Sequence, residues 1–182
     1  THRHHHAVRA CEPKQCKALT QKVFGMITTQ LSILAHIQTG PFGSQLHKED
    51  YAKDGTPIVT VEHLGERLFT RQNLPSVSEH DKQRLAKYQM LPGDIIFSRV
   101  GSVDRCSQAQ AQNDGWLFSG RCLRVRPNKE IDSNYLYYWL SSKAVKKRIQ
   151  SIAVGATMPS INTSLLGEIE VPLQSQEDQA AV

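Results

Sequence analysis

Residues 154–173 read "VGATMPSINTSLLGEIEVPL", and this stretch decides the fold because it joins two unlike halves. The first half is small and polar, with the turn-forming residues Gly155, Pro159 and Asn162. The second half, from Leu165 onward, alternates apolar and polar residues, which is typical of a strand. A polar loop beside a buried strand predicts a binding loop on a rigid scaffold.

Strands and helices alternate along the rest of the chain. Strands are predicted where β-branched or alternating residues stand between turn signals, and helices where apolar residues recur on one face behind a cap. This interspersed order predicts the α+β class. The predicted strands are 56–64, 94–100, 115–127 (a strand pair or one bent strand) and 168–173; the predicted helices are 13–30, 78–88, 132–153 and 175–182.

The helix predicted over residues 132–153 has the strongest pattern. Asp132 or Ser133 is expected to cap its N-terminus. Its expected buried face holds Leu136, Trp139, Leu140 and Val145. We therefore expect Trp139 and Leu140 to belong to the core.

The charge is unevenly distributed along the 182 residues, which carry a net charge of +5. Residues 99–148 contain ten basic and four acidic residues, between a nearly neutral segment and an acidic C-terminal one. Such a basic middle predicts an electropositive face and an anionic partner, with ordinary solvated charges as the alternative. The basic residues 1–30 are expected to form an appendage or linker helix.

The composition excludes several classes of protein. No apolar run approaches the ~18 residues of a membrane helix, and no signal peptide is visible, so we expect a cytoplasmic protein without membrane contact. The four cysteines lack zinc-site spacing. Cys106 and Cys122 lie among alternating apolar residues, which predicts small buried side chains.

Catalytic motifs are missing from the sequence. It contains no phosphate-binding loop, no dinucleotide fingerprint and no nucleophile elbow, so no cofactor is expected. Asp94 with Glu168 or Glu170 could hold a metal in a small nuclease, although no lysine-containing nuclease motif follows Asp94. We therefore favour a module without catalysis of its own.

Three turn-rich loops leave apolar strands, at residues 38–46, 98–105 and 155–164. Their side chains suit DNA: Gln45 for adenine, and Arg99 or Arg105 for guanine. For Arg99 the alternative is a salt bridge to Asp94 or Asp104. The candidate DNA-binding residues are Gly43, Ser44, Gln45, His63, Ser98, Arg99, Ser102, Arg105, Thr157, Ser160, Lys146 and Lys147.

Some of these candidate residues suit the DNA phosphates rather than the bases. Glycine amides, Ser102 and Ser160 suit phosphate oxygens, and so do the helical Lys146 and Lys147. A structural role is weighed equally for two residues of the opening stretch, since Pro159 fixes φ and Ile161 can fill the core.

The chain resembles a target recognition domain of the specificity subunit of type I restriction–modification enzymes. The matching segments, across about residues 31–182, are "IQTGPFGSQLHKEDY", "GTPIVTVEHL", "LPGDIIFSRVGSVDRC", "GWLFSGRCLRVRP", "IDSNYLYYWLSS", "AVGATMPSINTSLLGEIEVPL" and "SQEDQAAV". The equivalent domain of a fused restriction–modification enzyme is the other form of this resemblance.

The resemblance implies a mixed, strongly bent sheet or partial barrel with flanking helices over residues 31–174. It implies sequence-specific binding of double-stranded DNA, reading one half of a bipartite site in the major groove. Residues 175–182 would begin a truncated spacer helix. The implied partners are DNA methyltransferase subunits, which bind AdoMet, a restriction subunit, and a second recognition domain or a second copy of the chain.

Two alternatives from other classes stay open at this point. One is the metal-dependent nuclease with Asp94 as a ligand. The other is a protein-interaction domain whose basic helix docks an acidic partner through Lys143, Lys146, Lys147 and Arg148.

Overall fold

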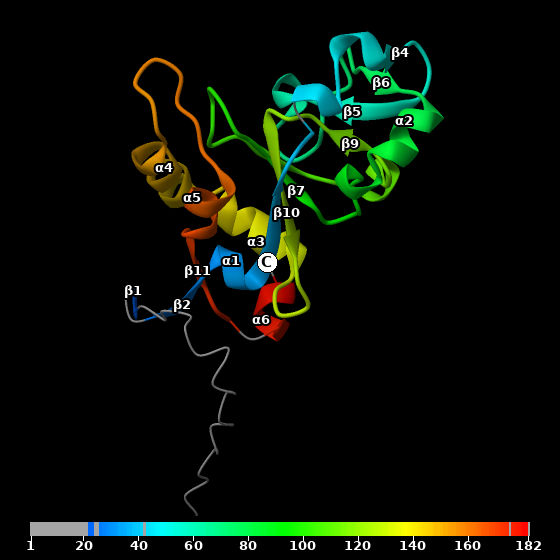
Figure 1. Cartoon of the computed structure of the whole chain (residues 1–182). Helices are drawn as coiled ribbons and strands as arrows, with labels where there is room; N and C mark the ends of the chain where they lie inside the picture. Colours follow the sequence, from blue (N-terminus) through cyan, green and yellow to red (C-terminus); the bar gives the residue numbers. More distant parts are fainter. Residues whose placement is uncertain (1–21, 24–25, 42, 175, 182) are drawn as a thin grey trace, which may run out of the picture.

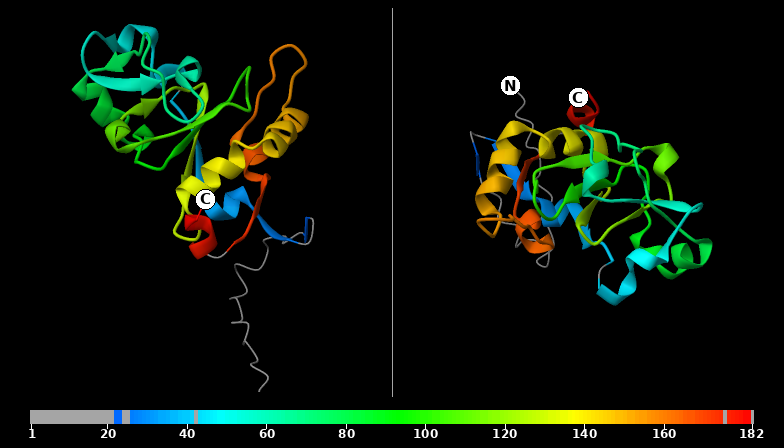
Figure 2. Two further views of the ribbon diagram at one scale, coloured as in Figure 1. Left: turned by 180° about the vertical axis from the view of Figure 1, so that it is seen from behind. Right: turned by 90° about the horizontal axis from the view of Figure 1, so that it is seen from above.

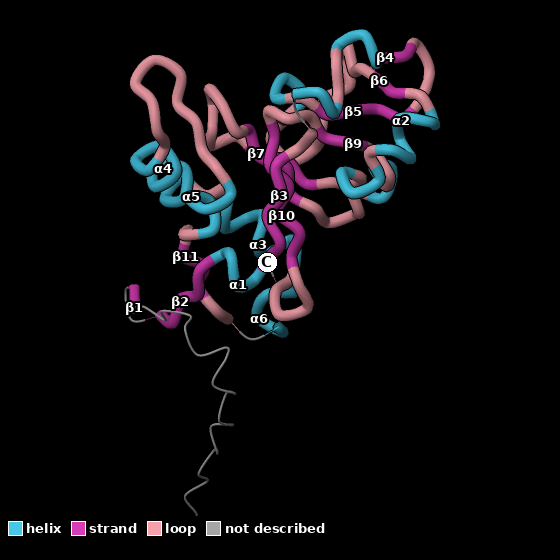
Figure 3. Tube along the Cα trace, viewed as in Figure 1, coloured by secondary structure: helices cyan, strands magenta, loops and turns pink. Residues whose placement is uncertain are grey.

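The computed structural model describes residues 22–23, 26–41, 43–174 and 176–181. Within this part, short strands form three sheets with helices packed beside them (Figures 1 and 3). The α+β class is confirmed, and the described strands form open sheets rather than a closed barrel. The strands are β1 (Lys22–Val23), β2 (Met26–Gln30), β3 (Ala35–Thr39), β4 (Tyr51–Ala52), β5 (Thr56–Val59), β6 (Ser76–Val77), β7 (Ile95–Ser98), β8 (Cys106–Gln108), β9 (Leu117–Phe118), β10 (Cys122–Pro127) and β11 (Glu170–Pro172). The α-helices are α1 (Leu31–Leu34), α2 (Glu79–Arg84), α3 (Ser133–Leu140), α4 (Lys143–Ile152), α5 (Thr163–Gly167) and α6 (Gln176–Ala180), and the 3₁₀ turns are η1 (Gly43–Gln45), η2 (Lys48–Asp50), η3 (Val61–His63), η4 (Ala86–Tyr88) and η5 (Ala111–Asn113).

The central sheet, with strand order β3-β10-β7-β8, is antiparallel and separates two hydrophobic cores. Successive side chains of a strand point to opposite faces of the sheet. Ile95 and Phe97 of β7 therefore pack in the first core, whereas Ile96 between them packs in the second. All three side chains are fully buried, so β7 has no solvent-exposed face.

The first core lies between the central sheet and the helices α1, α3, α4 and α5, which form the lower lobe in Figure 1. Leu136 and Leu140 of α3 are fully buried there, beside Val145 and Ile149 of α4. Spacings of four residues place each pair on one face of its helix. Ile161, from the loop before α5, also enters this core and is 2% exposed, so the core-filling role weighed for it is confirmed.

The second core belongs to the upper lobe, in which the sheet has the order β4-β6-β5-β9. Its β5–β9 pair is parallel, which places β9 beside β5 although about sixty residues separate them in the sequence. Ser78 accepts a hydrogen bond from the amide of Asp81 (3.2 Å) and so caps α2, as the sequence predicts. The helix predicted over 78–88 continues after α2 as the 3₁₀ turn η4.

Arg124 of β10 is buried between the central sheet and the second lobe and is only 3% exposed. Its Nη1 donates to the carbonyl oxygens of Lys87 (3.1 Å) and Gln89 (3.0 Å), and its Nη2 donates to Gln38. Burial lowers the pKa of this guanidinium, and the nearby positive charge of Arg126 lowers it further. The second lobe, which contains the β4-β6-β5-β9 sheet, thus covers the face of β10 that carries Arg124.

Arg126 binds Asp94 through two hydrogen bonds, from Nε to Oδ1 (2.9 Å) and from Nη2 to Oδ2 (2.7 Å). The Asp94 side chain is 2% exposed, and its carboxylate raises the pKa of Arg126. Bidentate pairs of this kind are among the stronger polar contacts in proteins. The carboxylate also accepts from the Leu91 amide (2.8 Å), so it closes the turn before β7.

The single helix predicted over 132–153 is wrong in one respect: it breaks into α3 and α4. Asp132 caps α3 by accepting from the Tyr135 amide (2.9 Å), as expected. Ser142 then caps a second helix by accepting from the Val145 amide (3.4 Å). A serine in that position competes for backbone groups and favours a new N-terminus over a continuous helix.

Trp139 differs from its expected core position. It is half-buried and packs against the edge of the first core, whereas Leu140 is fully buried. Its indole Nε1 donates to the carbonyl oxygen of Glu170 (2.8 Å), so the ring joins α3 to β11 with its polar edge.

The helix predicted over 13–30 is wrong for the residues that the structure describes, and residues 13–21 and 24–25 lie outside them. Met26–Gln30 form β2, which pairs antiparallel with β11. Thr28 and Thr29 are buried in this pairing, at 2% and 7% exposure. Their β-branched side chains favour the extended backbone, so the tertiary pairing prevails over the helical spacing of the apolar residues.

Other predicted elements are present with shorter bounds. The strand predicted over 56–64 ends at Val59 and continues as η3, and the segment 115–127 is a pair of strands, β9 and β10, in different sheets. The strand predicted over 168–173 is β11, and a helix, α6, lies within 175–182. No helix among the described residues is long and apolar enough to cross a membrane.

Candidate nucleic-acid interface

Two of the three predicted loops meet and form one surface. The amide of Gly101 donates to the carbonyl of Pro159 (2.8 Å), and the amide of Ile161 donates to the carbonyl of Arg99 (2.9 Å). Val100 and Ser160 form an isolated antiparallel bridge at this junction. Both views in Figure 2 and Figure 1 show the 154–160 hairpin beside the 99–105 loop.

The backbone of both loops depends on glycines with positive φ. Gly101 has φ +73°, and a Cβ atom there would meet no heavy atom within 4 Å, so the space in front of this turn is open. Gly155 has φ +104°, and a Cβ atom there would stand 2.8 Å from the carbonyl oxygen of Met158. Only glycine adopts these conformations without strain, so the turn residues of the sequence fix the shape of the surface.

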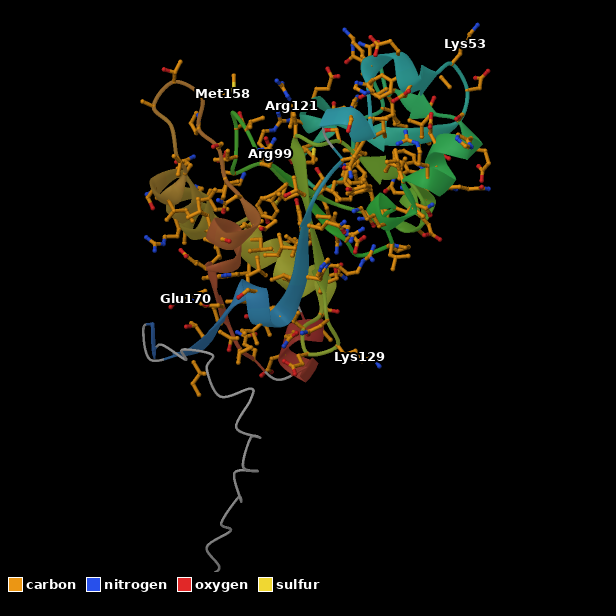
Figure 4. All side chains as sticks on the ribbon, viewed as in Figure 1. Lys53, Arg99, Arg121, Lys129, Met158 and Glu170 are labelled. Atoms are coloured by element: carbon orange, nitrogen blue, oxygen red, sulfur yellow. The ribbon has the colours of Figure 1, made fainter. Side chains whose placement is uncertain are left out.

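We define the loop face as residues 99–105, Arg121 and residues 154–161. It contains a cleft of about 200 Å³. Figure 4 shows Arg99, Arg121 and Met158 on the same side of the molecule, opposite Lys129 and Glu170. The cleft is lined by Val61, Ser98, Val100, Gly101, Ser102, Arg105, Arg121 and Met158.

A second cleft, of about 270 Å³, shares Arg105 with the first and also contains Lys146 of α4. Glu66 also lines this cleft, so its charged residues are two cations and one anion, and Arg105 and Lys146 are the two that suit an anionic group such as phosphate. Cys106 lines the same cleft, and burial raises the pKa of its thiol to about 12. The thiol is therefore protonated at neutral pH and is a poor nucleophile.

The three arginines of the loop face are held to different degrees. Arg99 Nε donates to the carbonyl of Gly120 (2.9 Å), and Arg105 Nη2 donates to the carbonyl of Leu64. Arg121 is exposed, and its guanidinium makes no hydrogen bond to the residues that the structure describes. A guanidinium without an internal partner keeps all its donors for a ligand.

The ion pair weighed as the alternative role of Arg99 is not formed between these described residues. Asp94 binds Arg126 instead. Asp104 accepts a hydrogen bond from Gln150 Nε2 (3.0 Å). Within the described part of the chain, Arg99 Nε therefore binds the backbone carbonyl of Gly120 and not the carboxylate of Asp94 or Asp104.

His63 is removed from the candidate DNA-binding residues by its burial. It is 0% exposed. Its Nδ1 accepts from the Thr60 amide (3.1 Å), and its Nε2 lies 3.0 Å from the Gln72 carbonyl. This arrangement requires the tautomer protonated at Nε2 and leaves neither nitrogen for DNA.

Ser98 is corrected in the same way. Its side chain is 1% exposed and donates to the carbonyl of Val100 (2.8 Å), so it shapes the turn after β7 from below. Gln45 is exposed, but its amide oxygen accepts from the Tyr88 hydroxyl (2.9 Å) and its carbonyl accepts from Arg84 (2.6 Å). The expected adenine contact of Gln45 would therefore require that its bond to Tyr88 be broken.

The remaining candidates fall into three places. Arg99, Ser102, Arg105, Thr157 and Ser160 lie on the loop face, where Thr157 is exposed and Ser160 is half-buried. Gly43 and Ser44 are exposed in η1. Lys146 lies half-buried in the second cleft, and Lys147 is exposed on α4.

Arg121 is the loop-face residue that sequence reasoning missed. The β7–β10 register pairs Ser98 with Cys122, and the Arg99 amide donates to the Arg121 carbonyl (2.8 Å). This pairing brings the residue after β7 beside the residue before β10. The only local signal for Arg121 is its position after Gly120 at the start of a strand. That Arg121 lies beside Arg99 depends on the pairing of β7 with β10, which cannot be inferred from the sequence alone.

A family model described as "Type I restriction modification DNA specificity domain" matches residues 28–181. The chain belongs to this family. The resemblance inferred from its sequence is therefore confirmed, and DNA specificity is the role that the family's description names.

Curated relatives of this specificity-domain chain include two proteins of Methanocaldococcus jannaschii. The putative type I restriction enzyme MjaX specificity subunit is 29% identical over 140 residues, covering 74% of this chain and 33% of the relative. The type I restriction enzyme MjaIX specificity subunit is 34% identical over 139 residues, covering 74% and 31%. The chain thus spans about a third of the length of these relatives.

Solved structures share the fold of this domain. The HsdS subunit from Thermoanaerobacter tengcongensis has a TM-score of 0.65 at 17% identity, over 90% of this chain and 37% of that one. The S subunit of a type I restriction–modification system from M. genitalium has a TM-score of 0.59 at 19% identity, over 90% and 39%. At these identities the likeness concerns the fold alone.

Proposed function

We propose that this specificity domain reads DNA sequence in the major groove with its loop face, as the target-recognition module of a restriction–modification enzyme. Residues 31–174 form the recognition domain in this proposal. The observation that supports it best is the junction of the 99–105 and 154–161 loops beside Arg121, which gathers three arginines on one face, two of which, Arg105 and Arg121, line the same cleft. Arginine is the side chain best suited to the two acceptors on the major-groove edge of guanine.

The division of labour follows from how each cation is held. Arg121 and Arg105 lie on the rim of the first cleft, where a planar donor group can meet a base edge. Lys146 and Lys147 lie on α4, and a mobile ammonium group suits phosphate oxygens. Base reading and phosphate binding are thus assigned to different elements.

The partners belong to the same proposal. Double-stranded DNA is the ligand, and methyltransferase subunits that bind AdoMet supply the chemistry, with a restriction subunit and a second recognition domain, or a second copy of the chain, completing the assembly. The domain carries no catalysis of its own. α6, whose Gln179 accepts a hydrogen bond from the Asp132 amide (2.7 Å), would begin the spacer helix.

The two alternative functions are less well supported. Asp94, the first ligand of the nuclease hypothesis, uses both carboxylate oxygens on Arg126, and no cluster of three or more metal-binding side chains occurs among the described residues. The protein-interaction hypothesis places its contacts on α4. It gives no role to the arginines gathered on the loop face.

Replacement of Arg121 by Ala should weaken binding to the preferred duplex by ~1–3 kcal/mol and relax the preference at one base pair. Arg121 is the cleanest probe because its guanidinium makes no internal hydrogen bond to the described residues. Selection of sites from random DNA by this chain, followed by anisotropy titrations, measures both effects. The control is Lys129→Ala, which removes the same charge at the opposite end of the molecule (Figure 4). An unchanged selected sequence with Arg121→Ala would assign this residue to phosphate.

Replacement of Lys147 by Ala should weaken binding to every sequence alike. A lost phosphate contact lowers the slope of log K against log salt by about one unit. Titrations of the selected duplex and of an unrelated duplex, each at several salt concentrations, test this prediction. A loss confined to the selected duplex would contradict it and would place Lys147 among the base-reading residues.

A further inference from the structure

The cleft of the loop face combines a cationic rim with an apolar lining. Arg105 and Arg121 lie on it together with Val61, Val100 and Met158. Met158 is 61% exposed, at the end of the hairpin. A single exposed apolar side chain is ordinary in proteins. Three apolar side chains in one cleft between guanidinium groups are a more specific feature, because phosphate binding has no use for them.

The backbone that carries Met158 is held on both sides. Val154 and Ser160 exchange two backbone hydrogen bonds (2.9 and 2.8 Å), which close the hairpin. Pro159, the next residue, accepts from the Gly101 amide (2.8 Å) and so joins the hairpin to the arginine-bearing loop. The position of Met158 relative to the cleft is therefore set before any ligand arrives, which reduces the ordering cost of binding.

We propose that this cleft is a specificity pocket for the 5-methyl group of thymine. The inference rests on the proposed function, because it supposes that the loop face enters the major groove. Thymine is the only one of the four bases that presents a methyl group there, next to its O4 acceptor, and apolar side chains recognise it by contact. Met158 would cover the methyl group from one side of the cleft, and Val61 and Val100 would contact it from the other.

The neighbouring arginines extend this assignment to the adjacent base pair. Arg105 and Arg121 line the same cleft, and their guanidinium groups match the O6 and N7 acceptors of guanine. The selected sequence should therefore contain a thymine next to a guanine, on the same strand or across the step. Cytosine in place of thymine lacks the methyl group, so 5-methylcytosine should recover part of the lost affinity.

The test removes the methyl group without changing the Watson–Crick pairing. The preferred duplex is first selected with this chain, and each thymine is then replaced in turn by uracil. At one position the wild-type chain should lose about three- to fourfold in affinity, the value expected for one buried methyl-sized group. Met158→Ala should discriminate less than the wild type between the thymine and uracil duplexes, whereas Met158→Leu, which keeps an apolar side chain, should retain the discrimination.

Two results separate this inference from the function on which it rests. If the wild-type chain selects a sequence but tolerates uracil at every thymine, the methyl pocket is wrong and the proposed function stands. If no sequence is selected and all duplexes bind alike, the proposed function itself fails. Melting temperatures of both Met158 variants should match the wild type, because the side chain lies at the surface, and they establish that altered discrimination is not a folding defect.

Discussion

Phe97→Ala should lower the free energy of unfolding by ~3–5 kcal/mol, the range measured for aromatic side chains deleted from cores. Phe97 is fully buried in the middle of the central sheet. It pairs with Leu123 on β10 and with Cys106 on β8. Strands on both sides hold the backbone in place, so the neighbours cannot collapse fully into the cavity. For a domain of this size the melting temperature should fall by roughly 10 °C.

The matched control for Phe97 is Leu68→Ala. Leu68 is 55% exposed, and surface substitutions usually change stability by less than ~0.5 kcal/mol. Chemical denaturation of the three chains, with the slope compared among them, gives the differences directly. A loss below 1 kcal/mol for Phe97→Ala would mean that the two lobes unfold separately or that the sheet repacks around the gap.

Local signals in the sequence predict the parts of the fold that depend on neighbouring residues. Ser78 and Asp132 cap the helices that follow them, as their spacing indicates. Gly101 and Gly155 have positive φ, as expected for glycines in turn-rich loops. Capping and turn conformation are decided within a few residues, so they can be inferred without knowledge of the tertiary structure.

Strand pairing and lobe packing could not be inferred in the same way. The alternation of Arg124 and Val125 in β10 is typical of a strand with one solvated face, yet the second lobe covers the arginine. His63 has the same explanation, since it is fully buried and its Nε2 pairs with the carbonyl of Gln72, nine residues further along the chain. Burial of a polar residue depends on what packs over it, and single-sequence patterns carry no record of that.

The candidate site shows both limits at once. The sequence predicts that Arg99 and Ser160 lie in loops of a binding surface, but only the backbone contacts Val100–Ser160 and Arg99–Ile161 show that the two loops form one face. Arg121 was missed because its place depends on the register between β7 and β10. The loops in the sequence thus predict which kinds of side chain the candidate site contains. Which individual residues come together in it can be learned only from the fold.

Asp94→Ala should destabilise the domain by ~2–4 kcal/mol. Removing one partner of a buried ion pair costs about 3–5 kcal/mol, and this figure is reduced here because the Arg126 side chain is 32% exposed and regains some water. The Leu91 amide also loses its acceptor. Asp114→Ala, at an exposed aspartate, is the charge-matched control and should leave the melting temperature unchanged.

Asp94→Asn decides between an ion-pair role and a metal-ligand role for this carboxylate. It keeps the size of the side chain but replaces one oxygen of the bidentate pair with Arg126 by an NH₂ group, so it should also destabilise, by less than Asp94→Ala. A metal ligand would give the opposite result. Without metal, the carboxylate would destabilise the wild type relative to Asp94→Asn, and added Mg²⁺ would stabilise the wild type alone, by mass action. Thermal melts of the wild type and of Asp94→Asn, with and without Mg²⁺, distinguish the two. A loss of stability in the variant that Mg²⁺ does not affect identifies Asp94 as the residue that fixes β7 and β10 below the loop face, and a selective stabilisation by Mg²⁺ would revive the nuclease hypothesis.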